Sequence, residues 1–248
     1  MKKILFLLLL IISIYVAGIY YIENFDSNNN YKLDHTLISQ IFKKHPNYVD
    51  SDNIPQSVKD AVVSMEDKRF YMHFGFDPIS IGRSIYVDIK NKKIVQGGST
   101  ISQQLARNLF LNNKKSFKRK IEEIFLAIKL ELNYSKKEIL EMYLNIVYFG
   151  NEAYGVNSAS KIYFGKNVSN ISRKESAMLA GIIQSPNNYN PKKNYTKAME
   201  REKIVLDVMN KTDIIGKKHS FKQYIRQGYI SCKNFLYDKF NYLVDQIN

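Results

Sequence analysis

Cysteine, strand signals and acidic residues are all scarce in this sequence. Cys232 is the single cysteine among 248 residues, so no disulfide framework can form within the chain. The cysteine count leaves the cellular compartment open. Lys and Arg together number 37 against 23 Asp and Glu, which gives a formal net charge of +14. A surface with this excess attracts anions such as nucleic acid, anionic lipid or a phosphorylated substrate.

The N-terminal segment has no charged residue from Ile4 to Ile22. As a helix, at about 1.5 Å per residue, it would span roughly 28 Å, close to the thickness of a bilayer's hydrocarbon core. A cleaved signal peptide is the alternative, but its apolar region would be shorter, and no clear cleavage site follows. Two lysines precede the run and two acidic residues follow it. We therefore expect a single-pass anchor in the cytoplasmic membrane, a cytoplasmic N-terminus and an extracytoplasmic bulk.

This topology makes nucleic acid an unexpected partner. The basic surface would instead meet anionic lipid headgroups or a lipid-linked phosphate. Residues 1–23 are then the cytoplasmic N-terminus with the anchor, and residues 24–53 are a polar juxtamembrane connector with a short strand or helix around residues 37–42.

Helical signals dominate the remaining chain, whereas strand signals and internal repeats are missing. Pro55 suits the first turn of a helix, and apolar residues then recur at helical spacing up to Met65. Capping boxes begin at Ser135 and Ser172 and predict two more helix starts. The sequence therefore predicts a mainly α fold, with further helices at residues 79–94, 101–110 (capped by Ser99 or Thr100), 118–133, 159–164 and 196–209.

The C-terminal tail, residues 213–248, is basic and aromatic. It can be a helical appendage that packs back on the domain. Alternatively, its interleaved basic and aromatic residues suit a helix at a membrane surface. Its role stays open at this point.

Two carboxylates have unusual surroundings. Glu66 begins a segment crowded with acids, bases and hydrogen-bond donors, which suits acid–base chemistry. On the residues alone, a helix-end carboxylate paired with Lys68 or Arg69 is an open alternative. Glu123 lines up with an apolar face of its helix, where an unpaired carboxylate is costly. Its ordinary partner would be Arg119, four residues earlier.

Four stretches in order resemble one family. They are EDKRFYMHFG (66–75), GGSTISQQLARN (97–108), RKIEE (119–123) and the segment from ILEMYLN to YFGK (139–166). Their order and spacing are similar to those of the peptidoglycan glycosyltransferases, glycosyltransferase family 51. The resemblance runs from about residue 54 to residue 209, and we assign residues 54–212 to this domain.

The resemblance implies a lysozyme-like, two-lobed fold and the polymerisation of lipid II. In that reaction the acceptor sugar's 4-hydroxyl attacks the donor's anomeric carbon, which inverts, and a polyprenyl pyrophosphate leaves. The product is a β-1,4-linked glycan strand. Bifunctional relatives add a transpeptidase domain, but here the only Ser-x-x-Lys, at residues 158–161, has no Lys-Thr-Gly downstream. The chain thus resembles a monofunctional transglycosylase.

The resemblance also assigns roles to individual residues. Glu66 matches the catalytic base and Glu123 a second carboxylate that assists at the leaving group. Asp67 is expected to orient or cap, and His73 to support. The pyrophosphate would be met by Arg107 and Lys115, and the sugars would be bordered by Ser99, Thr100, Gln103 and Gln104.

Some points depart from this pattern or remain open. Glu122 stands where several family members carry a basic residue, which puts one pyrophosphate contact in doubt. A divalent cation, Mg²⁺ or Mn²⁺, can accompany the pyrophosphate, although the sequence contains no tightly spaced cluster of metal-ligating residues. The expected partners are lipid II, the growing glycan chain, the membrane and other cell-wall synthesis proteins. Alternative functions are a lysozyme-like peptidoglycan hydrolase and a non-catalytic cell-wall scaffold.

Overall fold

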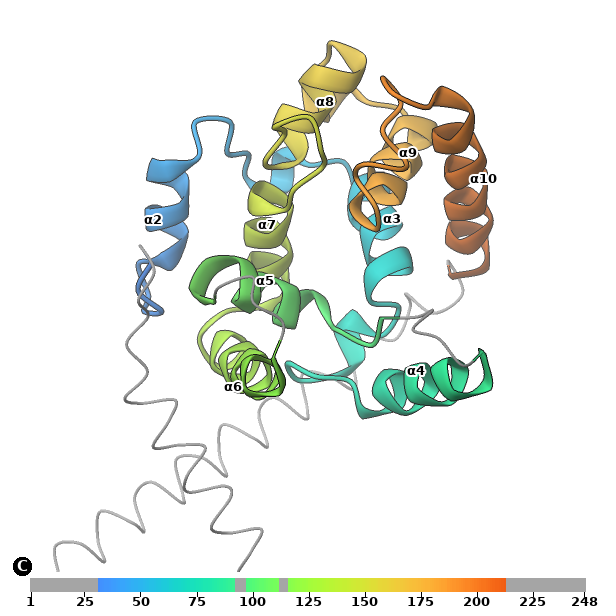
Figure 1. Ribbon diagram of the computed structural model, residues 1–248. Helices are drawn as coiled ribbons and strands as arrows, with labels where there is room; N and C mark the ends of the chain where they lie inside the picture. The colour runs from blue at the N-terminus through green and yellow to red at the C-terminus, as the bar shows by residue number, and fades with distance from the viewer. Residues whose placement is uncertain (1–30, 92–96, 112–115, 213–248) are drawn as a thin grey trace, which may run out of the picture. The chain divides into compact units, whose positions relative to one another are not determined.

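The computed structural model describes residues 31–91, 97–111 and 116–212 (Figure 1). The predicted anchor at residues 4–22, Lys115 and the tail at residues 213–248 lie outside the described residues. Within the described ranges the structure contains helices and two isolated β-bridges, and no named strand. The prediction of a mainly α fold is confirmed. Across these same ranges, no helix combines the length and the hydropathy needed to cross a membrane.

Most of the predicted helices are present, with small shifts at their ends. The helix at Ile101–Phe110 has the expected bounds, whereas the one predicted at residues 159–164 already begins at Val156. The segment around residues 37–42 is a helix rather than a strand. The α-helices are α2 (Leu37–Lys44), α3 (Gln56–Glu66), α4 (Pro78–Asn91), α5 (Ile101–Phe110), α6 (Phe117–Asn133), α7 (Lys136–Ile146), α8 (Val156–Phe164), α9 (Arg173–Ile183) and α10 (Tyr195–Thr212), with 3₁₀ turns at Ser51–Asn53, Phe70–Met72 and Val168–Asn170.

Three of these helices begin with a complete capping box. The two predicted boxes, which begin at Ser135 and Ser172, are both confirmed. A third one joins Thr100 and Gln103 at the start of α5, so Thr100 rather than Ser99 is the cap. Each box satisfies backbone N–H groups that the first helical turn leaves without partners.

The core lies where the helices pack against α7. Helix α5 contacts both α6 and α7, α7 also contacts α2 and α8, and α3 packs against α9 (Figure 1). Tyr143, Phe70 and Phe149 are the largest fully buried side chains. Leu37 and Ile41 of α2 belong to the same apolar cluster. The folded part therefore begins upstream of the predicted domain boundary at residue 54.

Helix α6 carries two apolar stripes, and they are buried to different extents. Leu126, Ala127 and Leu130 are fully buried. On the other stripe, however, Ile121 is 41% exposed, and Phe117 at the start of the helix is 83% exposed. Within the described part of the chain, α5 and α7 pack against α6, and the stripe with Leu126 and Leu130 is the one that they bury.

Candidate active site

Glu66 is the last residue of α3, and its carboxylate is held by a side-chain amide. The Gln104 Nε2 donates a hydrogen bond of 2.8 Å to Glu66 Oε2, and the Tyr143 hydroxyl donates one of 3.0 Å to Gln104 Oε1. Burial raises the pKa of Glu66, and the Gln104 hydrogen bond together with the charges of Arg201 and Arg107 opposes that rise. A carboxyl group with a raised pKa is suited to accept a proton.

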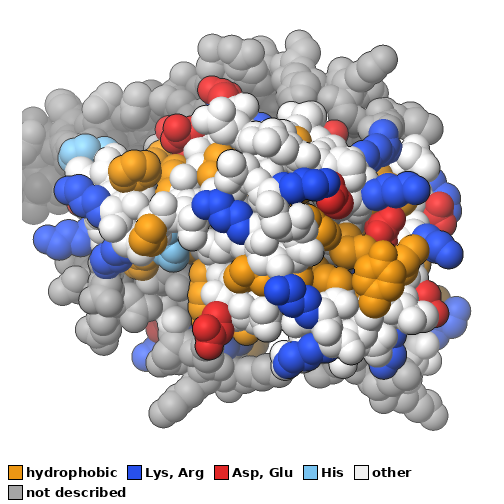
Figure 2. Space-filling view, turned by 90° about the horizontal axis from the view of Figure 1, so that it is seen from above, with side chains coloured by type: hydrophobic (Ala, Val, Ile, Leu, Met, Phe, Trp, Pro, Cys, Tyr) orange, Lys and Arg blue, Asp and Glu red, His pale blue; other side chains and the backbone are white. Residues whose placement is uncertain are grey.

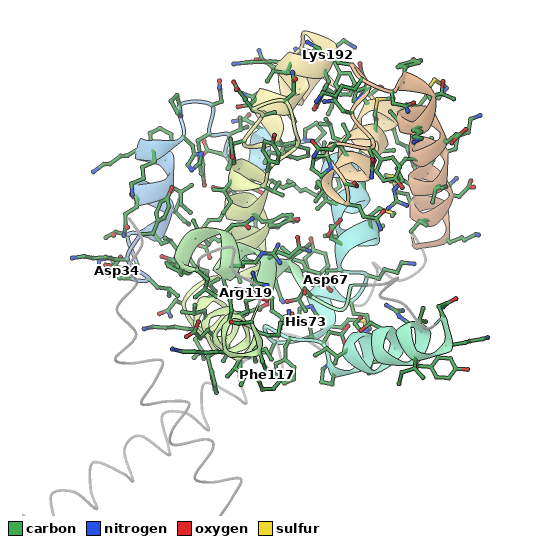
Figure 3. The ribbon with its side chains drawn as sticks, viewed as in Figure 1. Asp34, Asp67, His73, Phe117, Arg119 and Lys192 are labelled. Atoms are coloured by element: carbon green, nitrogen blue, oxygen red, sulfur yellow. The ribbon has the colours of Figure 1, made fainter. Side chains whose placement is uncertain are left out.

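Asp67 clamps the end of α3 to the start of α5. Its side chain is buried; one carboxylate oxygen lies 2.8 Å from His73 Nε2 and accepts a 3.0 Å hydrogen bond from the Ile101 backbone N–H. The Ile101 N–H is one of the groups left free at the N-terminus of α5. Asp67 thus accepts from a backbone N–H at the start of α5, as a capping residue does, whereas a supporting role of His73 in the site stays a prediction. Figure 3 shows Asp67 and His73 close together at the centre of the described part of the chain.

A polar pocket of about 60 Å³ opens beside Glu66. It brings together the predicted residues Glu66, Ser99 and Thr100, which come from α3 and from the segment before α5. Two further basic residues, Lys68 and Arg83, line it, and neither was predicted as a site residue. Arg83 lies on the exposed side of α4, and its sequence context does not distinguish it from a solvated arginine. The lining comprises Met65, Glu66, Asp67, Lys68, Ser80, Arg83, Gly97, Gly98, Ser99 and Thr100.

A larger hollow of about 180 Å³ lies elsewhere and includes none of the predicted site residues. It is lined by His45, Pro46, Asn47, Asn145, Glu152, Tyr154 and Ser158.

Glu123 is buried between two cations of its own helix. It is 1% exposed, with Arg119 Nε 3.2 Å from Oε1 and Lys120 Nζ 2.9 Å from Oε2. Arg119 was the partner expected from the sequence; Lys120 was missed, although its spacing of three residues also suits a helical pair. Lys120 Nζ in turn donates a 2.8 Å hydrogen bond to Ser99 Oγ. Glu123 is therefore connected through Lys120 to a residue that lines the pocket.

The remaining predicted residues lie on or next to α5. Gln103 is fully buried, and its Oε1 accepts a 2.9 Å hydrogen bond from the Thr100 backbone N–H. Thr100 Oγ1 donates a hydrogen bond of 2.6 Å to the Gly75 carbonyl oxygen, and this bond connects the segment after Glu66 to the start of α5. Arg107 is half-buried one turn after Gln104, and its charge acts on Glu66. The contacts of these residues with a substrate stay predictions, as does the role of Lys115.

Acidic and imidazole groups do not gather into a metal site within the described ranges. No group of three or more His, Cys, Asp or Glu side chains there is placed to hold an ion. Asp67 is already engaged by His73 and by a backbone N–H, and Glu123 by two cations. A divalent cation at the pyrophosphate stays a prediction.

Comparison with known proteins identifies the family. The Transglycosylase family model matches residues 34–210. The chain is 45% identical over 180 residues to penicillin-binding protein 1A/1B of Bacillus subtilis, covering 72% of this chain and 20% of that protein. It is 48% identical over 162 residues to penicillin-binding protein 1A of Aquifex aeolicus, covering 65% and 22%, respectively. The corresponding protein of Escherichia coli is 43% identical over 179 residues, covering 72% and 21%.

The chain thus spans about a fifth of the length of these relatives. The matched region contains α2 to α9, all but the last two residues of α10, and all the described site residues. The chain therefore belongs to the transglycosylase family, the peptidoglycan glycosyltransferases that its four motifs resemble.

Proposed function

We propose that this protein is a membrane-anchored glycosyltransferase that polymerises lipid II into β-1,4-linked peptidoglycan strands. The observation that carries the proposal is Glu66 itself. Its carboxylate has a raised pKa, accepts a hydrogen bond from Gln104 and lines a polar pocket that Lys68 and Arg83 also line. Family membership supports lipid II as the substrate, which would combine a sugar hydroxyl with a pyrophosphate leaving group.

Glu66 would act as the general base in this reaction. It takes the proton from the acceptor's 4-hydroxyl as that oxygen attacks the donor's anomeric carbon, and the bond to the pyrophosphate oxygen breaks. A positioned base typically contributes about 10²–10⁴-fold to a rate. Inversion at the anomeric carbon then yields the β-1,4 linkage.

Positive charge near the pocket would stabilise the departing pyrophosphate. Arg107 and Lys115 are the predicted contacts, and Lys68, Arg83 and Lys120 add charge at or beside the pocket. In this scheme Glu123 assists at the leaving group through Lys120, whose ammonium it holds near Ser99. On the face that Figure 2 shows, by contrast, Lys and Arg side chains are scattered among other residues instead of gathered into one patch.

Proximity to a membrane is supported by exposed apolar side chains on the turn after Glu66, on α4 and on α6. Met72 is 68% exposed, Ile79 66% and Ile89 72%, and Phe117 is 83% exposed. They lie on the turn after Glu66, on α4 and at the start of α6. Such residues would be compatible with lipid beside the site, where a lipid-linked substrate is held. The predicted anchor at residues 4–22 would keep the domain there.

A hydrolase remains the principal alternative because two carboxylates on a helical scaffold can also cleave glycans. The cations at and beside the pocket, Lys68, Arg83 and Lys120, favour transfer, since a neutral glycan has no anionic leaving group to stabilise. In addition, Glu123 is buried and engaged by two cations, so it is poorly placed to activate a water molecule.

The test uses the full chain in detergent with purified lipid II, and separately with purified sacculi. The wild type should form glycan polymer and release no fragments from sacculi. Glu66→Gln should lower polymerisation by at least about 100-fold while circular dichroism shows an unchanged fold. The matched control, Glu152→Gln, removes an exposed carboxylate outside the pocket and should retain activity.

Each alternative predicts a different result. Fragments from sacculi without polymer from lipid II would favour the hydrolase. The absence of both polymer and fragments would favour the non-catalytic scaffold. Full polymerisation by Glu66→Gln would reject Glu66 as the base.

A further inference from the structure

We infer that Tyr143 is a positioning residue, whose hydroxyl fixes the Gln104 amide in the orientation that donates to Glu66. The kinetic consequence of this inference rests on the proposed function. The hydrogen-bond arrangement itself does not.

The three side chains form a continuous chain across three helices. Tyr143 of α7 donates to Gln104 Oε1 over 3.0 Å, and Gln104 of α5 donates through Nε2 to Glu66 Oε2 of α3 over 2.8 Å. An amide has one accepting and one donating end, and an ionised carboxylate only accepts. Gln104 must therefore present its NH₂ group to ionised Glu66. A Tyr hydroxyl can donate or accept; in the structure the Tyr143 hydroxyl donates to Oε1 and so stabilises the same orientation.

The Tyr143 hydroxyl is suited to this task over a wide pH range. The side chain is fully buried, and burial raises the pKa of its hydroxyl well above the ordinary value. The hydroxyl consequently stays protonated wherever Glu66 titrates. A phenyl ring would fill almost the same volume, so packing alone does not require the oxygen. A buried hydroxyl is costly unless it makes a hydrogen bond, and this one bonds to Gln104.

The orientation of the amide matters for the base. A hydrogen bond to the charged form of a carboxyl group favours that form, whereas a reversed amide would place Oε1 against the carboxylate. Burial already raises the pKa of Glu66, and the Gln104 hydrogen bond is the first influence that opposes it. Tyr143 therefore helps Glu66 to remain ionised and able to accept a proton.

Other charged groups around Glu66 lie outside the hydrogen bonds that join Tyr143, Gln104 and Glu66. Arg107 of α5 and Arg201 of α10 favour the ionised carboxylate, while neighbouring Asp67 disfavours it. The same Arg107 and Asp67 also influence Tyr143. All three keep their charges when the Tyr143 hydroxyl is removed, so a change in Tyr143 isolates the contribution of the oriented amide.

The experiment replaces Tyr143 with Phe and uses two readouts. The titration of Glu66 is followed by ¹³C NMR in the substrate-free protein labelled at the glutamate carboxyl groups, with the resonance assigned from Glu66→Gln. The pH profile of kcat/KM is measured with lipid II. Both the Glu66 titration and the acidic limb of the profile should move upward by roughly half a pH unit, about the size of one hydrogen bond. KM should change little and kcat should fall.

The matched control is Tyr163→Phe. Tyr163 is likewise a hydroxyl donor, although it is half-buried rather than fully buried, and it donates to the Phe149 carbonyl over 2.8 Å. Among the described residues, its hydroxyl takes no part in the hydrogen bonds that join Tyr143, Gln104 and Glu66. Neither readout should move in this variant. A shift equal to that of Tyr143→Phe would overturn the inference, because a general loosening of the core would then explain both.

A second variant, Gln104→Leu, tests whether Tyr143 acts through the amide. It should raise the Glu66 titration at least as far as Tyr143→Phe does, and the double variant should add nothing further. An unchanged titration in Tyr143→Phe, or full additivity in the double variant, would reject the inference. If Tyr143→Phe does not fold, an unchanged Glu66 titration in Gln104→Leu is sufficient to reject the inference. The NMR result holds even if lipid II is not the substrate, so failure of the proposed function is seen separately.

Discussion

The ion pair between Arg69 and Asp77 should make a measurable, pH-dependent contribution to stability. Two guanidinium nitrogens of Arg69 donate to the Asp77 carboxylate over 2.9 and 2.7 Å. The same carboxylate accepts from the backbone N–H groups of Ile79 and Ser80 at the start of α4. The pair therefore closes the segment that follows Glu66 and anchors α4.

The expected magnitude follows from the pKa of Asp77. Burial alone would raise it, but the hydrogen bonds from Arg69 and Ser80 prevail and lower it from 3.8 to about 2. At about 1.36 kcal/mol per pKa unit, this shift corresponds to about 2 kcal/mol. Because the folded-state pKa is the lower one, the stabilisation is complete above pH 3.8 and disappears as the pH falls towards 2.

The assay compares Asp77→Asn with the wild type by urea unfolding between pH 7 and pH 3. The difference in free energy of unfolding should be about 2 kcal/mol at neutral pH and about 1 kcal/mol at pH 3. Asp52→Asn is the control, because its pair with Lys137 is exposed and screened by water, so it should change stability little. A difference for Asp77→Asn that is near zero, or that grows as the pH falls, would refute this reasoning.

Two further substitutions, each with a matched control, test the surroundings of the site. Gly75→Ala should destabilise the fold by roughly 1–3 kcal/mol in urea unfolding, because φ is +80° and the new Cβ would lie 2.9 Å from the Ile128 backbone N. Gly82→Ala, inside α4 with nothing within 4 Å of the new Cβ, should be neutral or stabilise by up to about 1 kcal/mol; equal losses would contradict the prediction. Glu123→Gln should cost roughly 3 kcal/mol and reduce lipid II polymerisation by loosening Lys120. Glu122→Gln on the same helix, 3.9 Å from an exposed lysine, should leave both measurements nearly unchanged, and similar losses in the two variants would reject a special role for Glu123.

Local sequence signals predicted the helices well because helix ends depend on nearby residues. The boxes at Ser135 and Ser172 form within one turn, and both are present. Glu66 was expected at or near a helix end and is the last residue of α3. The pair of Glu123 with Arg119 was also expected from their spacing of four residues.

Burial and long-range pairing were harder to predict. Helix α6 has two apolar stripes, but which one is covered depends on where α5 and α7 lie. Lys68 and Arg83 resemble ordinary surface cations in the sequence and are placed at the pocket by the turn after α3 and by α4. Gln103 appeared to be equivalent to its neighbour Gln104. In the helix, however, successive side chains point about 100° apart, so one is buried and the other reaches Glu66.

By itself, the sequence determined the helical class, the capped helix starts, the family motifs and the identity of the proposed base, because these are encoded in neighbouring residues or in motif order. Tertiary structure alone decided how that base is supported. Gln104 lies 38 residues from Glu66 along the chain, and Tyr143 lies 39 residues beyond Gln104. Ser99 reaches Lys120 across 21 residues. Such contacts exist only once α3, α5, α6 and α7 have packed together, since no local preference specifies which side chains meet.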